Sequence, residues 1–308
     1  MIFNFALFLK GIAMGAANVI PGVSGGTIAF VTGIYEELIE SLKSFDTKAL
    51  RLGLGFKIKE LSEHINLKFL FALFLGIAVS LFTLGKLLDW LFTHYPIFIW
   101  SFFFGLILAS VYYVSKNIKQ WKATTYVMFA IGVAAAVTLA FAKPAEENDS
   151  FVYVALCGVV AVCSMILPGL SGSFVLILMG NYQLVMLQAV PNFNLTIIIP
   201  FAVGGAVGFV VLSHIIAYLL KHFHDATLSL LTGFILGSLI VIWPWKSEVY
   251  LANDAGELIL KEGIKIVQGY DWNLPNFTVG ATWIGIVLIG AGIISVSLLE
   301  RLATPNHK

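Results

Sequence analysis

Long apolar runs, separated by short polar segments, fill most of the chain. About 20 apolar residues in a helix cross the ~30 Å hydrocarbon core of a bilayer. Six runs are of that order and predict transmembrane helices, at roughly 68–91, 97–115, 123–142, 195–220, 227–243 and 279–299. Two further apolar regions, 1–43 and 151–190, are interrupted near their middle. We expect each of these two to form a re-entrant helical hairpin.

The two interruptions share one sequence pattern. The first reads Pro21-Gly22-Val23-Ser24-Gly25 and the second reads Pro168-Gly169-Leu170-Ser171-Gly172. Proline lacks a backbone N–H and glycine leaves the backbone loose, so neither stretch continues a helix. Lipid cannot satisfy the bare backbone groups, which must be covered by protein or line a wet cavity. Matched helix breaks of this kind point to the binding site of a transporter.

The matched breaks belong to a longer internal repeat. With Pro21 aligned to Pro168, the halves are residues 1–142 and 143–308, each with one hairpin and three crossings. Further along, Gly76 and Gly105 of the first half align with Gly204 and Gly233 of the second, once the extra segment 44–66 is left out of the alignment. A re-entrant hairpin returns the chain to the side of the membrane from which it started, whereas three transmembrane spans carry it to the opposite side. The second half is therefore inverted relative to the first. The predicted fold is an all-α polytopic membrane protein with an inverted repeat in a single membrane domain.

Lysine and arginine positions predict the orientation. Segment 44–66 and loop 116–122 are rich in these residues, which places both, and both termini, in the cytoplasm. Loops 143–150 and 246–277 then lie outside, and alternation between residues 248 and 267 predicts a small β-hairpin. Segment 44–66 also alternates basic and apolar residues, which fits either an amphipathic segment on an anionic membrane face or an ordinary loop.

Composition supports the membrane class and excludes others. Apolar residues make up 59% of the chain and charged residues 11%, and the mean hydropathy is +0.94. The net charge of +1 gives no basic field for nucleic acid. Cys157 and Cys163 show no metal-ligand spacing, and we expect no metal and no cofactor. Without a nucleotide-binding motif, transport is expected to be passive or coupled to an H⁺ or Na⁺ gradient.

The hairpin tips are the predicted binding site. New half-helices are expected to begin at about Gly26 and Gly172, where unpaired N–H groups and neighbouring hydroxyls suit an anionic head group such as a phosphate monoester. The alternative is that the small residues only allow close helix packing. The candidate head-group residues are Asn18, Ser24, Gly25, Gly26, Thr27, Ser171, Gly172 and Ser173.

Four further ionisable residues are candidate gate or accessory charges: Lys86, Asp89, His214 and Glu36. Ionisable groups within a membrane are functional candidates by default. The repeat aligns Lys86 with His214, so one titratable group stands near each mouth. The alternatives are snorkelling for Lys86, a satisfied core histidine for His214, and an interfacial position for Glu36.

Two other functions stay open on the residues alone. A small-anion transporter or channel would use the same tips as its filter. The run Gly22-Val23-Ser24-Gly25-Gly26 formally matches a nucleophile elbow, and an intramembrane serine hydrolase would pair Ser24 with His214. No strand precedes the motif and the serine is duplicated, which argues against an enzyme.

Residues 15–27, followed by Thr32-Gly33-Ile34-Tyr35-Glu36, strongly resemble a bacterial and archaeal membrane family. That family was long catalogued as a domain of unknown function and is now described as polyprenyl-phosphate transporters. The second break resembles theirs too, and the resemblance covers essentially the whole chain. It implies a plasma-membrane flippase that returns undecaprenyl phosphate, a lipid carrier for cell-wall synthesis, from the outer to the inner leaflet. Asn18 stands where the family motif often has Asp, so the identity of the coupling ion stays open. Assembly into a homo-oligomer is also left open.

Overall fold

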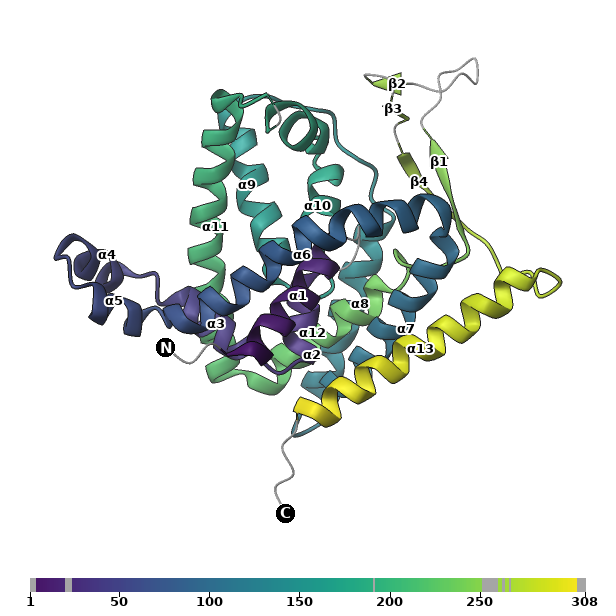
Figure 1. Cartoon of the computed structure of the whole chain (residues 1–308), viewed down its shortest axis with the longest axis horizontal. Helices are drawn as coiled ribbons and strands as arrows, with labels where there is room; N and C mark the ends of the chain where they lie inside the picture. Colours follow the sequence, from purple (N-terminus) through teal and green to yellow (C-terminus); the bar gives the residue numbers. More distant parts are fainter. Residues whose placement is uncertain are drawn as a thin grey trace.

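The computed structural model describes residues 4–19, 24–190, 192–250, 260–261, 264–265 and 267–303, and these residues are mostly helical (Figure 1). The helices are α1 (Phe5–Val19), α2 (Gly25–Val31), α3 (Tyr35–Lys43), α4 (Thr47–Leu54), α5 (Ile58–His64), α6 (Leu67–His94), α7 (Pro96–Ser115), α8 (Ala123–Ala140), α9 (Phe151–Ile166), α10 (Gly172–Leu178), η1 (Gln183–Ala189, a π-helix), α11 (Leu195–His222), α12 (His224–Ser238) and α13 (Gly280–Ala303).

Five helices in the described part of the chain are long and apolar enough to cross a membrane: α6, α7, α8, α11 and α13. These confirm five of the six predicted spans and the polytopic membrane class. The sixth, predicted at 227–243, is the shorter helix α12, which has 15 residues and ends at Ser238. At 1.5 Å per residue, α12 extends only about 22 Å. It begins three residues earlier than predicted, and turns replace its last part.

The helices pack in pairs that follow the sequence repeat. Helix α1 packs along α6, as α9 packs along α11. Helix α7 packs along α13, and α8 packs along α12. The first two pairs each lie within one half of the chain, whereas each of the other two joins a helix of one half to a helix of the other.

Matched glycines bring these pairs close together. A side chain at Gly76 would meet the Phe8 carbonyl of α1, and one at Gly204 would meet the Ala155 carbonyl of α9. In the same way Gly105 lies against the Ile289 carbonyl of α13, and Gly233 against the Phe129 carbonyl of α8. Glycines that allow backbones to approach are typical of helix interfaces in membranes. The positions that the repeat aligned therefore make equivalent contacts.

A pair of antiparallel strands confirms the predicted hairpin in the loop before α13. Strand β1 (Lys246–Tyr250) pairs with β4 (Val267–Trp272), with Lys246 opposite Trp272. Two short strands, β2 (Leu260–Lys261) and β3 (Ile264–Lys265), pair beyond them. The Lys246 ammonium lies 3.9 Å from the centre of the Trp100 ring, and the Trp272 indole N–H donates to the Ile240 carbonyl at 2.8 Å. These contacts fix the base of the hairpin to α7 and to the end of α12.

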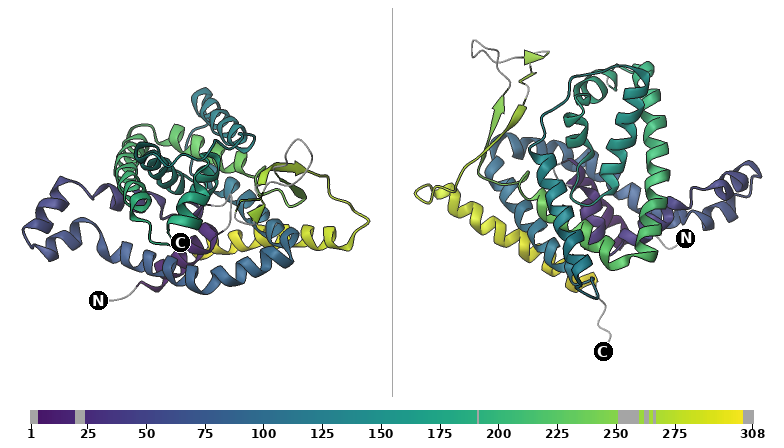
Figure 2. Two further views of the ribbon diagram at one scale, coloured as in Figure 1. Left: turned by 90° about the horizontal axis from the view of Figure 1, so that it is seen from above. Right: turned by 180° about the vertical axis from the view of Figure 1, so that it is seen from behind.

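Segment 44–66 folds as two short helices rather than as an irregular loop. The Asp46 carboxylate accepts hydrogen bonds from the Lys48 and Ala49 N–H groups, both at 2.9 Å, and so caps α4. The His64 ring lies 3.1 Å from the same carboxylate and holds the end of α5 beside the start of α4. Helices α4 and α5 project from the rest of the molecule in every view (Figures 1 and 2).

Candidate functional site

Both breaks start a new short helix at a serine cap. Ser24 has an extended backbone (φ −117°, ψ 135°), and its side chain accepts a hydrogen bond from the Gly26 N–H at 3.1 Å. Ser171 has a similar backbone (φ −99°, ψ 128°) and accepts from the Phe174 N–H at 3.5 Å. Serine at this position satisfies backbone donors that the first helical turn leaves unpaired. The predicted helix starts are thus confirmed at Gly25 and Gly172. Residues 20–23, including Pro21 and Gly22, lie outside the described residues.

Side chains of the first break bind the backbone of the second. The Ser24 hydroxyl lies 3.2 Å from the Met165 carbonyl oxygen and 3.3 Å from that of Leu167. The Gly169 N–H donates to the Thr27 hydroxyl oxygen at 2.9 Å. Ser24 and Thr27 are each only 1% exposed. The two breaks, distant in sequence, therefore meet in the interior, and we call this meeting point the crossing.

The remaining polar side chains at the crossing make local contacts. The Asn18 side-chain oxygen accepts from the Gly25 N–H at 2.7 Å, across the gap between α1 and α2. The Ser171 and Ser173 hydroxyls lie 2.8 Å apart and bond to each other. The structure brings Asn18, Ser24, Gly25, Gly26 and Thr27 together with the backbone of the second break. Ser171 and Ser173 stay on the side of α10.

The glycines of the crossing also have a packing role. A Cβ at Gly26 would lie 2.6 Å from the Ile166 carbonyl oxygen, and one at Gly172 would lie 2.6 Å from that of Ala161. Gly169 has a positive φ of +82°, and a Cβ there would lie 2.7 Å from the backbone of Phe234 on α12. The packing interpretation of these small residues thus has direct support, and it holds alongside any role in binding.

A cavity of about 140 Å³ opens beside the crossing. Asn18, Gly25 and Gly26 form its polar part. The rest of its wall is apolar and comes from α1, α3, α6, α9 and α11: Met14, Leu38, Leu42, Leu73, Phe74, Ile77, Val162, Met165, Ile166 and Phe209. Phe74 and Met165 are 49% and 47% exposed, so this wall continues onto the outer surface of the helices. A polar end and an apolar, outward-facing wall suit an amphiphile better than a hydrated ion.

Of the predicted accessory charges, the two whose side chains the structure describes, His214 and Glu36, do not line this cavity. Lys86 and Asp89 belong to α6, but their side chains lie outside the described residues. His214 is exposed and lines a separate groove of about 540 Å³ between α11 and the start of α4, together with Asp46 and Leu50. The alternative of a satisfied core histidine is therefore wrong for His214.

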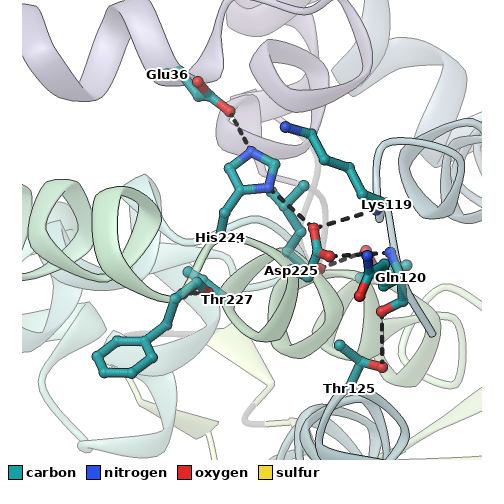
Figure 3. A network of polar contacts seen from close by, with 10 residues as sticks. Glu36, Lys119, Gln120, Thr125, His224, Asp225 and Thr227 are labelled. Atoms are coloured by element: carbon teal, nitrogen blue, oxygen red, sulfur yellow. Dashed lines mark hydrogen bonds and ion pairs between the residues drawn. The ribbon is translucent and has the colours of Figure 1, made fainter. Parts of the chain in front are cut away.

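Glu36 joins a polar network at the start of α3 (Figure 3). One Glu36 carboxylate oxygen lies 3.2 Å from His224 Nε2, and His224 Nδ1 lies 3.3 Å from the Asp225 carboxylate. Asp225 also accepts from the Lys119 and Gln120 N–H groups, at 3.2 and 3.0 Å. The network thus ties the start of α3 to the start of α12 and to the loop before α8.

Two properties of the network follow from its geometry. A neutral histidine ring donates through only one nitrogen, so His224 serves both carboxylates as a donor only when protonated. Desolvation raises the pKa of Asp225, but hydrogen bonds from His224, Lys119 and Gln120 outweigh it and hold that pKa below its ordinary value. His224 and Asp225 are not among the residues predicted from the sequence; the only signal for them is that they are two polar residues at a sharp turn between apolar helices.

The serine-hydrolase interpretation gains no geometric support. The Ser24 hydroxyl points at two backbone carbonyls, and His214 Nδ1 contacts the carbonyl of Val210 on its own helix at 2.8 Å. Among the described residues no group of three or more His, Cys, Asp or Glu side chains has the arrangement of a metal site. The expectation of no metal and no cofactor stays a prediction.

Comparisons with known proteins agree on one family. A family described as undecaprenyl phosphate translocase-like matches residues 14–259. A polyprenyl-phosphate transporter of Vibrio cholerae serotype O1 is 45% identical over 253 residues, which is 82% of this chain and 82% of the relative. A polyprenyl-phosphate transporter of Staphylococcus aureus is 32% identical over 259 residues, or 79% of this chain and 87% of the relative. No solved structure shows a significant match.

Proposed function

Because the chain belongs to the undecaprenyl phosphate translocase-like family, we propose that it moves undecaprenyl phosphate from the outer to the inner leaflet of the plasma membrane, for reuse in cell-envelope synthesis. The observation that carries this proposal is the cavity at the crossing, with its polar end at Asn18 and its apolar wall. A volume of about 140 Å³ is smaller than the ~300–1,000 Å³ of pockets for drug-sized ligands. It therefore fits a head group whose long tail stays in lipid.

The head group would be held by groups that already bind oxygen atoms. In the structure the Gly25 N–H donates to the Asn18 side-chain oxygen and the Gly26 N–H to the Ser24 hydroxyl. A phosphate oxygen is a stronger acceptor than either, so it would take over these donors when bound. The Asn18 amide would supply a further donor. Ser171, Gly172 and Ser173 do not line this cavity and would bind the head group only at another stage of transport. The tail would leave along Phe74 and Met165, toward the bilayer.

Transport itself would use the inverted repeat. Two re-entrant hairpins that meet at a crossing, one from each half, suit a site that opens alternately to the two leaflets. The matched helix pairs and their matched glycines support a repeat of this kind. Both termini and segment 44–66 would then be cytoplasmic, and the head group would enter near Lys86 and leave near His214. Coupling to H⁺ or Na⁺, and assembly into a homo-oligomer, remain part of the proposal.

Lipid flipping in proteoliposomes tests this function directly. Purified protein is reconstituted with labelled undecaprenyl phosphate, and a membrane-impermeant phosphate binder reports the outward-facing fraction. We expect protein-dependent loss of leaflet asymmetry in the native protein and at least a tenfold slower rate for Asn18→Leu, since one good hydrogen-bonding group lost in a desolvated site costs about 1.4 kcal/mol or more. A pH or sodium gradient applied in parallel reveals coupling.

The matched control is Asn192→Leu, which makes the same substitution at an exposed asparagine outside the cavity and should flip lipid at the native rate. No protein-dependent exchange under any gradient would refute lipid transport. Normal flipping by a well-folded Asn18→Leu protein would keep the function but move the head group away from this cavity. Conductance in planar bilayers, or labelling of Ser24 by a fluorophosphonate probe, would instead favour a channel or a hydrolase.

A further inference from the structure

The helical hairpin α4–α5 carries an apolar surface that the rest of the described chain leaves uncovered. Leu50 and Leu54 are four residues apart on α4 and so share one face of it. Phe56 lies in the turn, and Ile58 begins α5. These four side chains are 64%, 74%, 86% and 64% exposed, and we call them the tip patch.

Basic residues accompany the tip patch. Between Leu50 and Lys59 the chain contains Arg51, Lys57 and Lys59 and no acidic residue. All three basic residues are exposed, although Lys57 also contacts the carboxylate of Glu60 at 3.2 Å. Asp46 lies at the base of the hairpin, where it is paired with His64. The tip is therefore both apolar and positively charged.

The hairpin directly precedes a candidate membrane span. Its second helix ends at His64, and the candidate membrane span of α6 begins at Leu67. Two residues separate them, so α5 cannot extend far from the membrane. Exposed apolar side chains next to basic ones, held at this level, match the way amphipathic helices lie in the head-group region.

We propose that the tip patch inserts into the head-group region of the same bilayer and binds anionic phospholipids. The four apolar side chains reach the acyl boundary, while Arg51, Lys57 and Lys59 contact lipid phosphates. A second copy of the chain is a poorer occupant. A two-fold contact would place the patch against itself and bring the three basic residues of both copies together. This proposal does not depend on what the protein transports.

Depth-dependent fluorescence quenching tests the insertion on the full-length protein in vesicles. Cys157 and Cys163 are replaced by Ala, and a bimane label is attached through Phe56→Cys or, as the control, through Glu63→Cys, an exposed acidic position on the same hairpin. In vesicles with phosphatidylglycerol we expect shallow nitroxide-labelled lipid to quench the label at position 56 about threefold more than that at position 63. Aqueous iodide should show the reverse order.

The charge contribution has its own test. Vesicles made only of phosphatidylcholine, or the triple variant Arg51→Gln, Lys57→Gln and Lys59→Gln, should reduce lipid quenching at position 56, because each basic residue near an anionic surface strengthens attachment by about fivefold. Equal iodide quenching at positions 56 and 63 in both kinds of vesicle would overturn the proposal. Efficient disulfide formation between two Phe56→Cys chains would also overturn it, since a second copy would then cover the patch.

Discussion

The two helix breaks have nearly the same sequence but different roles in the structure. The first break supplies side chains that reach across the molecule, because Ser24 and Thr27 bind the backbone around the second break. The second break supplies mainly backbone, and its own hydroxyls, Ser171 and Ser173, bind each other. Repeated motifs thus need not do the same work. Side chains of the first break thus make the hydrogen bonds that join the two breaks, and the backbone of the second break is their partner.

The short helices that follow the two breaks, α2 and α10, also end in different surroundings. This difference predicts the largest change in stability. Gly33 after α2 and Gly180 after α10 both have left-handed backbones, with φ of +69° and +75°. A Cβ at Gly33 meets nothing within 4 Å, whereas one at Gly180 meets the backbone of Ala145 and Glu146. We expect Gly180→Ala to lower the free energy of unfolding by about 2–4 kcal/mol and Gly33→Ala by about 1–2 kcal/mol. Thermal unfolding in detergent measures both.

Equal losses for the two glycine variants would mean that backbone strain alone decides the effect. A larger loss for Gly33→Ala would contradict the arrangement around α10. Because the two positions are aligned by the repeat and carry the same substitution, each variant serves as the control for the other.

The serine caps predict the next effect. Ser24→Ala removes a helix cap and also the donor to Met165 and Leu167, so we expect a loss of about 2 kcal/mol. Ser171→Ala removes a cap whose hydrogen bond is longer, together with the contact to the Ser173 hydroxyl on the same helix. We expect it to lower the free energy of unfolding by about 1 kcal/mol. Melting temperatures in one detergent compare the variants. Equal losses would show that the bonds from Ser24 to the second break add nothing to stability.

The smallest predicted effect concerns how the stability of the protein falls at acidic pH. The contacts named at the crossing join uncharged groups, whereas the network at the start of α3 contains Asp225, whose pKa is lowered. A carboxylate with a lowered pKa in the folded state stabilises the protein above its ordinary pKa, and the benefit is lost as the pH falls through the folded value. Asp225→Asn should therefore flatten the fall in melting temperature below about pH 4. Ser24→Ala should keep the native pH profile, and an unchanged profile in Asp225→Asn would contradict the role of this carboxylate.

The sequence predicted features that depend on local chemistry. Apolar run lengths located α6, α7, α8, α11 and α13, and the Pro-Gly pattern located both breaks to within a residue of the observed helix starts. The fold of segment 44–66 was left open, although Asp46 before a periodic stretch is a recognisable helix-start signal.

Long-range contacts were out of reach. Ser24 and Thr27 bind backbone groups near Met165 and Gly169, and a backbone carbonyl or N–H leaves no mark on residue type. The pairing of Glu36 with His224 joins residues far apart in the chain, and although Glu36 ends a recognisable motif, His224 lies in none. The length of α12 was also misjudged, because apolar residues after Ser238 form turns that pack beside the strands instead of a further helical turn.

The exchange of helix partners between the halves has a consequence for how the protein is made. Helices α7 and α8 leave the ribosome before α9, α10 and α11, and their long-range partners α12 and α13 are synthesised only after these. Until α12 and α13 have been made, the glycine-containing faces of α7 and α8 lack their packing partners, and the membrane contains an incompletely packed helix bundle. A chain arrested before α13 would carry every residue of the crossing and still be incomplete. Helix α13 thus completes a contact begun by the first half.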